Sequence, residues 1–396
     1  MKKAIEKKCE WLPLIYVGMF IVIAHLVVWM FSGNSPLSPN PYNSYVLQAE
    51  AWRDGSLDLG RGYSHLELAE YDYRYFVSFP PFPSVVYYPL VLLGIPVPEG
   101  LIALITSVLG GILCCMLLKS CSVSDTCAAV ISILTVCGSN LLFVSVNAWV
   151  WFIAQNMCFT LTVASLLCAV KKRGFLCFLL WACAVGCRPF QILYLPLLCL
   201  ILMKSCGSGI RLFVSKPHWF AGAAVLAAFY MWLNYARFGN IFEFGHNYLP
   251  EFTQAEKGQF NIAYMKTNLY SLIRLPMLSS SGALKMQQFD GMNMFLVSPV
   301  FIYAVCLYFA DFKNNRLIKT AALITIIAEL LAITAHKTMG GWQFGNRYTV
   351  DCIPAALLIA AMSCRRQHPA PALTLLTVFG VLFNLAGTVL CYLDAL

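Results

Sequence analysis

The polar segment between Ser32 and Pro83 carries carboxylates that could do acid–base chemistry. Glu50 and Asp54 lie four residues apart, and Glu70 and Asp72 form a Glu-x-Asp triplet with Tyr71 between them. A carboxylate held next to a substrate hydroxyl can accept its proton in a group-transfer reaction. We predict that the catalytic base is one of these four acids, with Asp72 and Glu50 ahead of Glu70 and Asp54.

A second set of residues could bind an anion, because arginine holds phosphate or carboxylate through two parallel hydrogen bonds. These residues all lie on the predicted outer side, in the loops and turns between apolar stretches. An alternative for each arginine is that it reaches lipid headgroups or pairs with an acid. The predicted substrate-binding residues are Arg188, Arg237, His246, Arg274, Arg347 and Tyr348.

The elements that position these residues are membrane helices. The chain has 396 residues, of which 60% are apolar and 11% charged, and its mean hydropathy is +0.71. This composition predicts an all-α, polytopic transmembrane bundle of about 11–13 helices and excludes a soluble protein. We expect one integral membrane domain over 1–396. The run Trp11–Phe31 is too long for a signal peptide core and is interpreted as a retained anchor.

Basic clusters between the apolar stretches predict the orientation. The lysines before Trp11 place the N-terminus in the cytoplasm by the positive-inside rule. The loops 33–81, 237–292 and 337–347 then face outward. Four pieces between 82 and 170 would leave Lys171 outside, so one of them is predicted not to cross. The sequence contains twelve candidate membrane stretches. The first is Trp11–Phe31, and the other eleven lie at about 82–97, 99–118, 123–145, 148–170, 174–186, 189–203, 216–236, 293–310, 317–336, 348–363 and 370–393.

The first outward loop is predicted to begin with a helix on the membrane surface. Asn40 is a suitable N-cap, Pro41 fits the first helical position, and Gly55 fits the position after the last turn. The prolines at 80, 81 and 83 prevent a helix from starting before about Phe82 and favour an extended path into the membrane.

Other classes of site lack a motif. Most of the seventeen cysteines lie in apolar runs, where they serve as small core residues. The Cys and His spacings match no zinc site, and nothing resembles a glycine-rich phosphate loop. The net charge of +9 is carried by the clusters between apolar stretches and does not imply nucleic acid. The sequence specifies no cofactor and leaves the need for a divalent cation open.

Three motifs resemble the GT-C type of polytopic glycosyltransferase, the superfamily of protein O-mannosyltransferases and bacterial aminoarabinose transferases. The first is an acidic outer loop with the Glu-x-Asp triplet and TyrPheValSerPheProProPheProSer before the next membrane helix. The others are TyrAlaArgPheGlyAsnIlePheGluPheGly at 235–245 and GlyGlyTrpGlnPheGlyAsnArgTyr at 340–348. The length and loop placement are similar over nearly the whole chain, as in bacterial members.

The resemblance implies a sugar donor on a polyprenyl phosphate, an unknown acceptor on the outer face of the cell membrane, and a first-loop carboxylate as base. Many members place an acidic pair just past the first helix, where this chain has Asn40-Pro41-Tyr42-Asn43. That departure moves the expected base to Glu50 or to the triplet. Trp149, Trp151 and Gln155 could line a sugar site, although an aromatic belt explains the tryptophans equally well.

Two functions of other classes stay open. A transporter or flippase of a lipid-linked or amphipathic substrate would carry several charges within its membrane segments, whereas here only Glu329 lies well inside one. A non-catalytic scaffold of envelope assembly is the other.

Overall fold

The computed structural model describes residues 2–278, 284–286 and 288–393. In the described residues, seven helices are long and apolar enough to cross a membrane. Two of them, α9 and α11, are preceded by a 3-10 turn (η1 and η2). The seven are α1 (Lys2–Ser32), α4 (Glu99–Ser120), α7 (Val150–Val170), η1–α9 (Pro189–Tyr194 and Leu195–Cys206), η2–α11 (Pro217–Phe220 and Ala221–Phe238), α16 (Arg316–Ala335) and α18 (Pro371–Tyr392).

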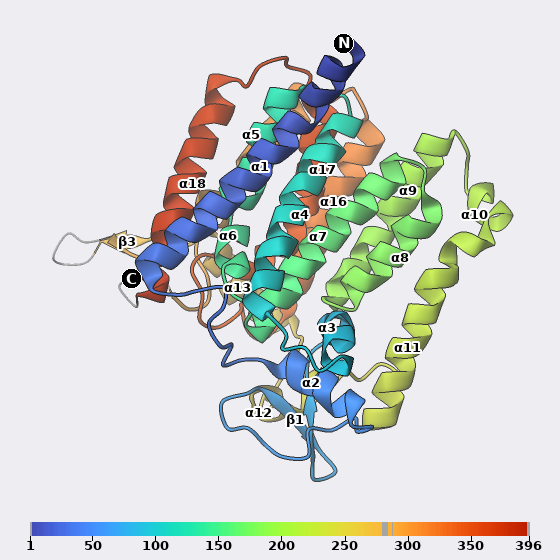
Figure 1. Ribbon diagram of the computed structural model, residues 1–396, viewed down its shortest axis with the longest axis vertical. Coiled ribbons are helices and arrows are strands. Elements are labelled where there is room, and N and C mark those ends of the chain that lie inside the picture. Colours follow the sequence, from blue (N-terminus) through green and yellow to red (C-terminus); the bar gives the residue numbers. More distant parts are fainter. Residues whose placement is uncertain (1, 279–283, 287, 394–396) are drawn as a thin grey trace.

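Shorter helices complete the bundle, whose members run side by side in Figure 1. Every one of the twelve predicted apolar stretches contains a helix, so the prediction of a polytopic helical membrane protein is confirmed. The shorter bundle helices are α3 (Phe82–Leu92), α5 (Asp125–Val136), α6 (Leu141–Ser145), α8 (Gly174–Val185), α14 (Met294–Val297), α15 (Val300–Ala310), and α17 (Ile353–Ser363) after the 3-10 turn η4 (Arg347–Cys352).

The remaining elements lie outside the bundle and are short. They include two hairpins, which the all-helical prediction did not contain. These elements are α2 (Ser44–Arg53), β1 (Leu68–Tyr71), β2 (Arg74–Val77), α10 (Arg211–Ser215), η3 (His246–Tyr248), α12 (Pro250–Thr253), α13 (Ile262–Ile273), β3 (Met277–Leu278) and β4 (Leu284–Lys285).

The turns that carry the basic clusters gather at one end of the bundle, the end where the N-terminus lies in Figure 1. We call this the basic end, and the opposite end, with α2, α12 and β1, the loop end. Turns far apart in sequence bond to one another at the basic end. The contacts are Lys204 Nζ to Asn315 Oδ1 (3.0 Å), Asn315 Nδ2 to Met362 O (3.4 Å) and Arg365 Nη1 to Cys121 O (3.5 Å). Within one of these turns, Lys119 Nζ pairs with Asp125 Oδ1 (2.8 Å).

Helix α3 is the piece that stays at the loop end. Its 11 residues extend about 16 Å, roughly half the hydrocarbon thickness. Ser84 Oγ donates to Tyr45 O (2.9 Å) and to Gln48 Oε1 (2.8 Å), which fixes α3 on α2. With α3 at this end, the basic clusters that follow α7, α9, α15 and α17 all fall at the basic end. This agrees with the expectation that one of the four pieces between 82 and 170 does not cross.

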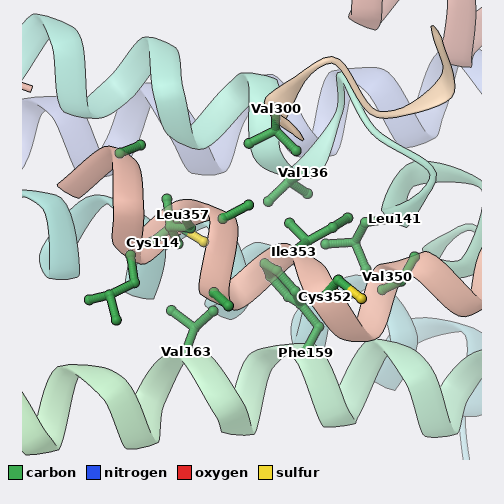
Figure 2. Close-up of a cluster of buried hydrophobic side chains, with 14 of the residues drawn as sticks. Cys114, Val136, Leu141, Phe159, Val163, Val300, Val350, Cys352, Ile353 and Leu357 are labelled. Carbon is green, nitrogen blue, oxygen red and sulfur yellow. The ribbon is translucent and has the colours of Figure 1, made fainter. Parts of the chain in front are cut away.

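Helix α17 forms the centre of the bundle, and all of its residues are buried. Figure 2 shows Ile353 and Leu357 of this helix among side chains of its neighbours, including Cys114 of α4, Phe159 of α7 and Val300 of α15. An apolar helix that is hydrophobic on every side is stable only when other helices enclose it. Most of the described cysteines are likewise buried, and those described form no disulfide.

Glycines let the helices approach closely. A Cβ on Gly111 of α4 would lie 2.2 Å from Ile21 Cδ1 of α1, and one on Gly110 would lie 2.7 Å from Thr160 Oγ1 of α7. Small residues at such crossings allow the backbone contact that stabilises helix pairs in a membrane.

Helix α2 confirms the predicted end but not the predicted start. Gly55 (φ +78°) follows it, with Gly55 N–H bonded to Trp52 O (3.1 Å) and Ser56 N–H to Ala51 O (2.8 Å). These two bonds are the Schellman arrangement that a left-handed glycine permits. The helix starts at Ser44, with Asn43 at the N-cap.

Asn40 is therefore not the N-cap, which corrects the prediction. Its Oδ1 accepts the N–H of Tyr42 (3.0 Å), and its Nδ2 donates to Glu99 Oε1 (2.9 Å) and to Ala148 O (2.8 Å). These bonds connect the first loop to the start of α4 and hold the chain in a turn before α2.

A β-hairpin replaces most of the extended path expected before Phe82. Strands β1 and β2 pair antiparallel, with Leu68 opposite Val77 and Tyr71 opposite Arg74. The tip residues Asp72 and Tyr73 have φ of +51° and +57°. A two-residue hairpin turn with such angles usually contains a glycine, and this one does not. The predicted helix start at Phe82 is confirmed.

We expect the loop end to face the outside of the cell. Tyr73→Cys, at a hairpin tip where the side chain is 95% exposed, should react in intact cells with a membrane-impermeant maleimide. Asn314→Cys at the basic end should react only after permeabilisation, and the unsubstituted protein gives the background from native cysteines. Labelling of Asn314→Cys alone in intact cells would reverse the orientation.

Candidate functional site

A cavity of about 900 Å³ opens at the loop end of the bundle. Its walls come from six parts of the chain that are far apart in sequence. These are the first loop, the start of α7, the turn before η1 with the first residues of η1, the second large loop, the segment from His336 to Tyr348, and Tyr392 at the end of α18. The cavity thus lies where the apolar helices meet both polar loops.

Two arginines and one tyrosine form the cationic wall of the cavity. The guanidinium carbon of Arg188 lies 4.9 Å from the centroid of the Tyr348 ring, and that of Arg347 lies 4.8 Å from the same centroid. The face of an aromatic ring attracts a cation, most strongly where water is excluded. Tyr348 therefore holds the two positive groups near each other.

Arg188 is oriented by a buried carboxylate. Its Nε and Nη2 lie 3.0 and 2.9 Å from Asp351 Oδ2. The Asp351 side chain is 1% exposed and that of Arg188 is 19% exposed, so the pair lies inside the protein with the arginine toward the cavity. Such a pair holds the guanidinium in a fixed direction.

Arg347 has no carboxylate partner within salt-bridge distance in the part of the chain that the structure describes. Its Nε and Nη2 donate to Gly340 O at 2.9 and 2.7 Å, and its Nη1 lies 3.4 Å from Gln155 Oε1. Gly340 has φ +112°, and a Cβ there would lie 2.9 Å from Arg347 Nε. Only glycine allows this approach, so the Gly340-Gly341 pair serves to position Arg347.

The carboxylates of the cavity are Glu67, Glu251 and Asp290. Glu67 lies just before β1, and its Oε2 accepts the indole N–H of Trp151 at 2.9 Å. Partial burial raises the pKa of Glu251, and the negative charge of Glu67 raises it further. The two glutamates are thus close enough to repel each other, and one proton or cation between them would relieve that repulsion.

Two histidines line the cavity in neutral form. Burial, together with the neighbouring His336, lowers the pKa of His246 to about 3. Burial also lowers the pKa of His336 to about 4, and the charges of Arg188 and Arg347 act in the same direction. The rings of the two histidines lie 6.1 Å apart. At neutral pH they can donate or accept hydrogen bonds but add no charge.

Aromatic rings cover much of the rest of the wall. Trp149 lies against Trp342 (5.3 Å between centroids) and against Phe152 (5.6 Å), and Trp151 lies against Tyr42 (4.9 Å). Such faces suit sugar rings and prenyl groups. The proposed sugar contact of Trp149 and Trp151 stays a prediction, while Gln155 holds Arg347 through both its amide atoms.

Four of the six predicted substrate-binding residues meet in this cavity, namely Arg188, His246, Arg347 and Tyr348. The other two do not line it. Arg237 is 3% exposed and donates to Val77 O (3.0 Å), so it fastens the end of α11 to β2. Arg274 donates through Nη2 to Gly291 O (3.0 Å) and supports the second loop.

None of the four acids predicted as catalytic lines this cavity. Glu50 is half-buried on α2, and exposed Asp54 pairs with Arg53 at 2.9 Å. Glu70 and Asp72 lie on the hairpin and line a second, open hollow of about 840 Å³. Their catalytic roles stay predictions, but none of these four side chains lines the large cavity.

Three residues of the site, Asp351, Glu67 and His336, carry no motif that predicts their role from the sequence. Asp351 follows Arg347 by four residues but lies in a stretch that reads as apolar. Glu67 belongs to the acidic run of the first loop but lies outside the Glu-x-Asp triplet. His336 directly follows α16 and precedes a predicted outer loop, and this position was the available signal for it.

The fold and the site define a polytopic helical membrane protein with an aromatic, cation-bearing cavity at one end of its bundle. No protein-family model matches the chain, and no curated protein matches it. A similar solved structure is the Archaeoglobus fulgidus oligosaccharyltransferase in the apo form, at 13% sequence identity and a TM-score of 0.46. The match covers 97% of this chain and 55% of that one, so the chain spans about half the length of that protein.

Stability should fall as the pH is lowered from 7 to 5, in part because of His336. Its folded pKa of about 4 lies below the ordinary value, so the unfolded chain takes up the proton first as the pH falls. The contribution of the neutral His336 to the free energy of unfolding is complete above about pH 6.5. At pH 5 it is smaller by on the order of 1–2 kcal/mol. Thermal unfolding in nanodiscs should show a flatter pH dependence for His336→Gln. Equal slopes for variant and wild type would contradict the neutral, buried histidine.

Proposed function

We propose that this protein is a membrane glycosyltransferase of the GT-C type. It takes a sugar from a polyprenyl-phosphate-linked donor and transfers it to an acceptor on the extracytoplasmic face of the cell membrane. The observation that carries the proposal is the pairing, in one cavity, of the buried Arg347, which has no carboxylate partner among the described residues, with Arg188. The acceptor and any divalent cation are left open.

The balance of charge on the cationic wall favours an anionic ligand. Arg188 and Arg347 contribute two positive charges there, and Asp351 neutralises one of them. A buried charge without a partner is costly, and a ligand phosphate would relieve that cost. Because the wall lies at the end of the membrane helices, the phosphate would sit at the boundary while its prenyl chain stays in hydrocarbon.

The carboxylates of the cavity suit the second half of the reaction. Glu67 can accept the proton of an acceptor hydroxyl as that oxygen forms its bond to the anomeric carbon. The bond from that carbon to the phosphate oxygen breaks, and the electron pair leaves with the phosphate. The two guanidinium groups stabilise the charge that develops on this leaving group. The atoms and electrons of this transfer balance without an oxidant, a reductant or a further cofactor.

Within this proposal Glu67 is favoured over the acids selected from the sequence. It is the first-loop carboxylate that lines the cavity among the described residues, and its bond to Trp151 fixes the side chain. Asp72 and Glu50 remain alternatives, which the same assay separates.

Replacing either arginine by lysine should reduce sugar transfer even though the charge is kept. Arg188→Lys cannot bond to Asp351 and a phosphate with the same geometry, and Arg347→Lys loses its two bonds to Gly340 O. We expect a loss of 10-fold or more for each in a membrane assay with a labelled polyprenyl-phosphate sugar. Arg274→Lys, at an arginine outside the cavity, is the matched control. Full activity in both cavity variants would leave these arginines as structural groups only.

Glu67→Gln should lower kcat by about 10²–10⁴-fold with little change in the KM for the donor. Glutamine keeps an oxygen for the Trp151 indole but cannot take a proton. Asp72→Asn and Glu50→Gln, measured in parallel, should retain activity. If one of those two loses activity and Glu67→Gln does not, the base is the acid identified from the sequence. If none does while the protein is correctly inserted, a transporter becomes the better explanation.

A further inference from the structure

Tyr45 carries a buried hydroxyl group that has no hydrogen-bond partner among the described residues. It lies in the first turn of α2, is 1% exposed, and is one of the residues that line the cavity. Its oxygen has no partner in the part of the chain that the structure describes. A buried donor without an acceptor destabilises a protein, so such a group calls for an explanation.

The fold of α2 does not need this hydroxyl. The Tyr45 ring packs edge-on against Phe79, with 6.4 Å between centroids. Its backbone oxygen accepts a hydrogen bond from Ser84, which joins α2 to α3. Phenylalanine would preserve both contacts, so packing accounts for the ring and leaves the oxygen unexplained.

Arg188 supplies a second free donor on the same wall. Asp351 occupies its Nε and Nη2, and the structure gives Nη1 no partner among the described residues. Tyr45 and Arg188 lie close enough for the arginine charge to act on the phenol. Burial, the larger effect, raises the pKa of the Tyr45 phenol, so the group keeps its proton and can donate it in a hydrogen bond.

We propose that Tyr45 Oη and Arg188 Nη1 form a phosphate subsite on the α2 side of the cavity. The subsite binds one oxygen of a prenyl phosphate monoester or diester. This assignment rests on the proposed function for the source of the phosphate, and it adds to that function a neutral hydroxyl that orients the donor. A tyrosine at this place contributes direction without further positive charge, which leaves Arg188 and Arg347 to hold the anion.

Tyr87 provides a matched control within the same chain. It is a tyrosine of α3, it is 0% exposed, and its hydroxyl also lacks a partner among the described residues. It is not among the residues that line the cavity. Removal of its oxygen therefore makes the same chemical change at a buried place without access to the ligand.

The test measures binding of farnesyl phosphate to the purified full-length protein in nanodiscs, with farnesol as the uncharged comparison. Tyr45→Phe should weaken farnesyl phosphate binding by about 10-fold, as expected for loss of one hydrogen bond to a charged group. Farnesol binding and the melting temperature should stay as in wild type, or the melting temperature should rise. Tyr87→Phe should leave both binding constants unchanged.

Three results would overturn the subsite. One is unchanged farnesyl phosphate binding in Tyr45→Phe, which would leave the hydroxyl to a buried water. Another is an equal loss of farnesol binding, which would indicate packing. The third is the same loss in Tyr87→Phe. A failure of the glycosyltransferase proposal looks different: farnesyl phosphate binding would still depend on Tyr45 while no sugar is transferred.

Discussion

The buried ion pair between Arg188 and Asp351 is the interaction on which the site depends. It joins the turn between α8 and η1 to η4, the turn that begins α17. Tyr194 reinforces the same junction, because its hydroxyl donates to Asp351 O (2.8 Å) and accepts the N–H of Ala355 (3.2 Å). Loss of one partner of such a pair typically costs about 3–5 kcal/mol. The pair therefore holds α8, α9 and α17 together, and it fixes the direction of the Arg188 guanidinium.

The rest of the bundle encloses the Asp351 side of that pair. Asp351 lies in η4, just before α17, and α17 is enclosed by α4, α5, α7, α15 and α16. The glycines at 340, 341 and 345 let the chain turn so that the Arg347 guanidinium lies over the Tyr348 ring, on the same wall as Arg188. The two cations thus lie next to the bundle, while the carboxylates of the cavity come from the two polar loops. This division would let a lipid phosphate bind to the cations while an acceptor approaches from the side of the loops.

Much of this arrangement could be predicted from the sequence. Arg188, His246, Arg347 and Tyr348 meet because each lies in a loop or turn that the pattern of apolar stretches places on the same side of the membrane. The choice among the first-loop acids could not be predicted, since it depends on a hairpin whose tip residues, Asp72 and Tyr73, take left-handed conformations without a glycine. Arg237 was predicted to bind substrate, but it lies one residue before the end of α11 and donates to Val77 O. Asp351 was hidden because a single acid in an apolar run carries no periodic signal.

The central claim is that the cavity holds the phosphate of a prenyl-linked donor between Arg188, Arg347 and Tyr45. Its most direct measurement is a cryo-EM structure of the full-length protein in nanodiscs with farnesyl phosphate. The account predicts phosphate density within hydrogen-bond distance of the Arg188 guanidinium and the Tyr45 hydroxyl, with the prenyl chain leading toward the hydrocarbon. Phosphate density at another place, for example beside Arg274 or in the open hollow at Glu70, with this cavity empty, would contradict it.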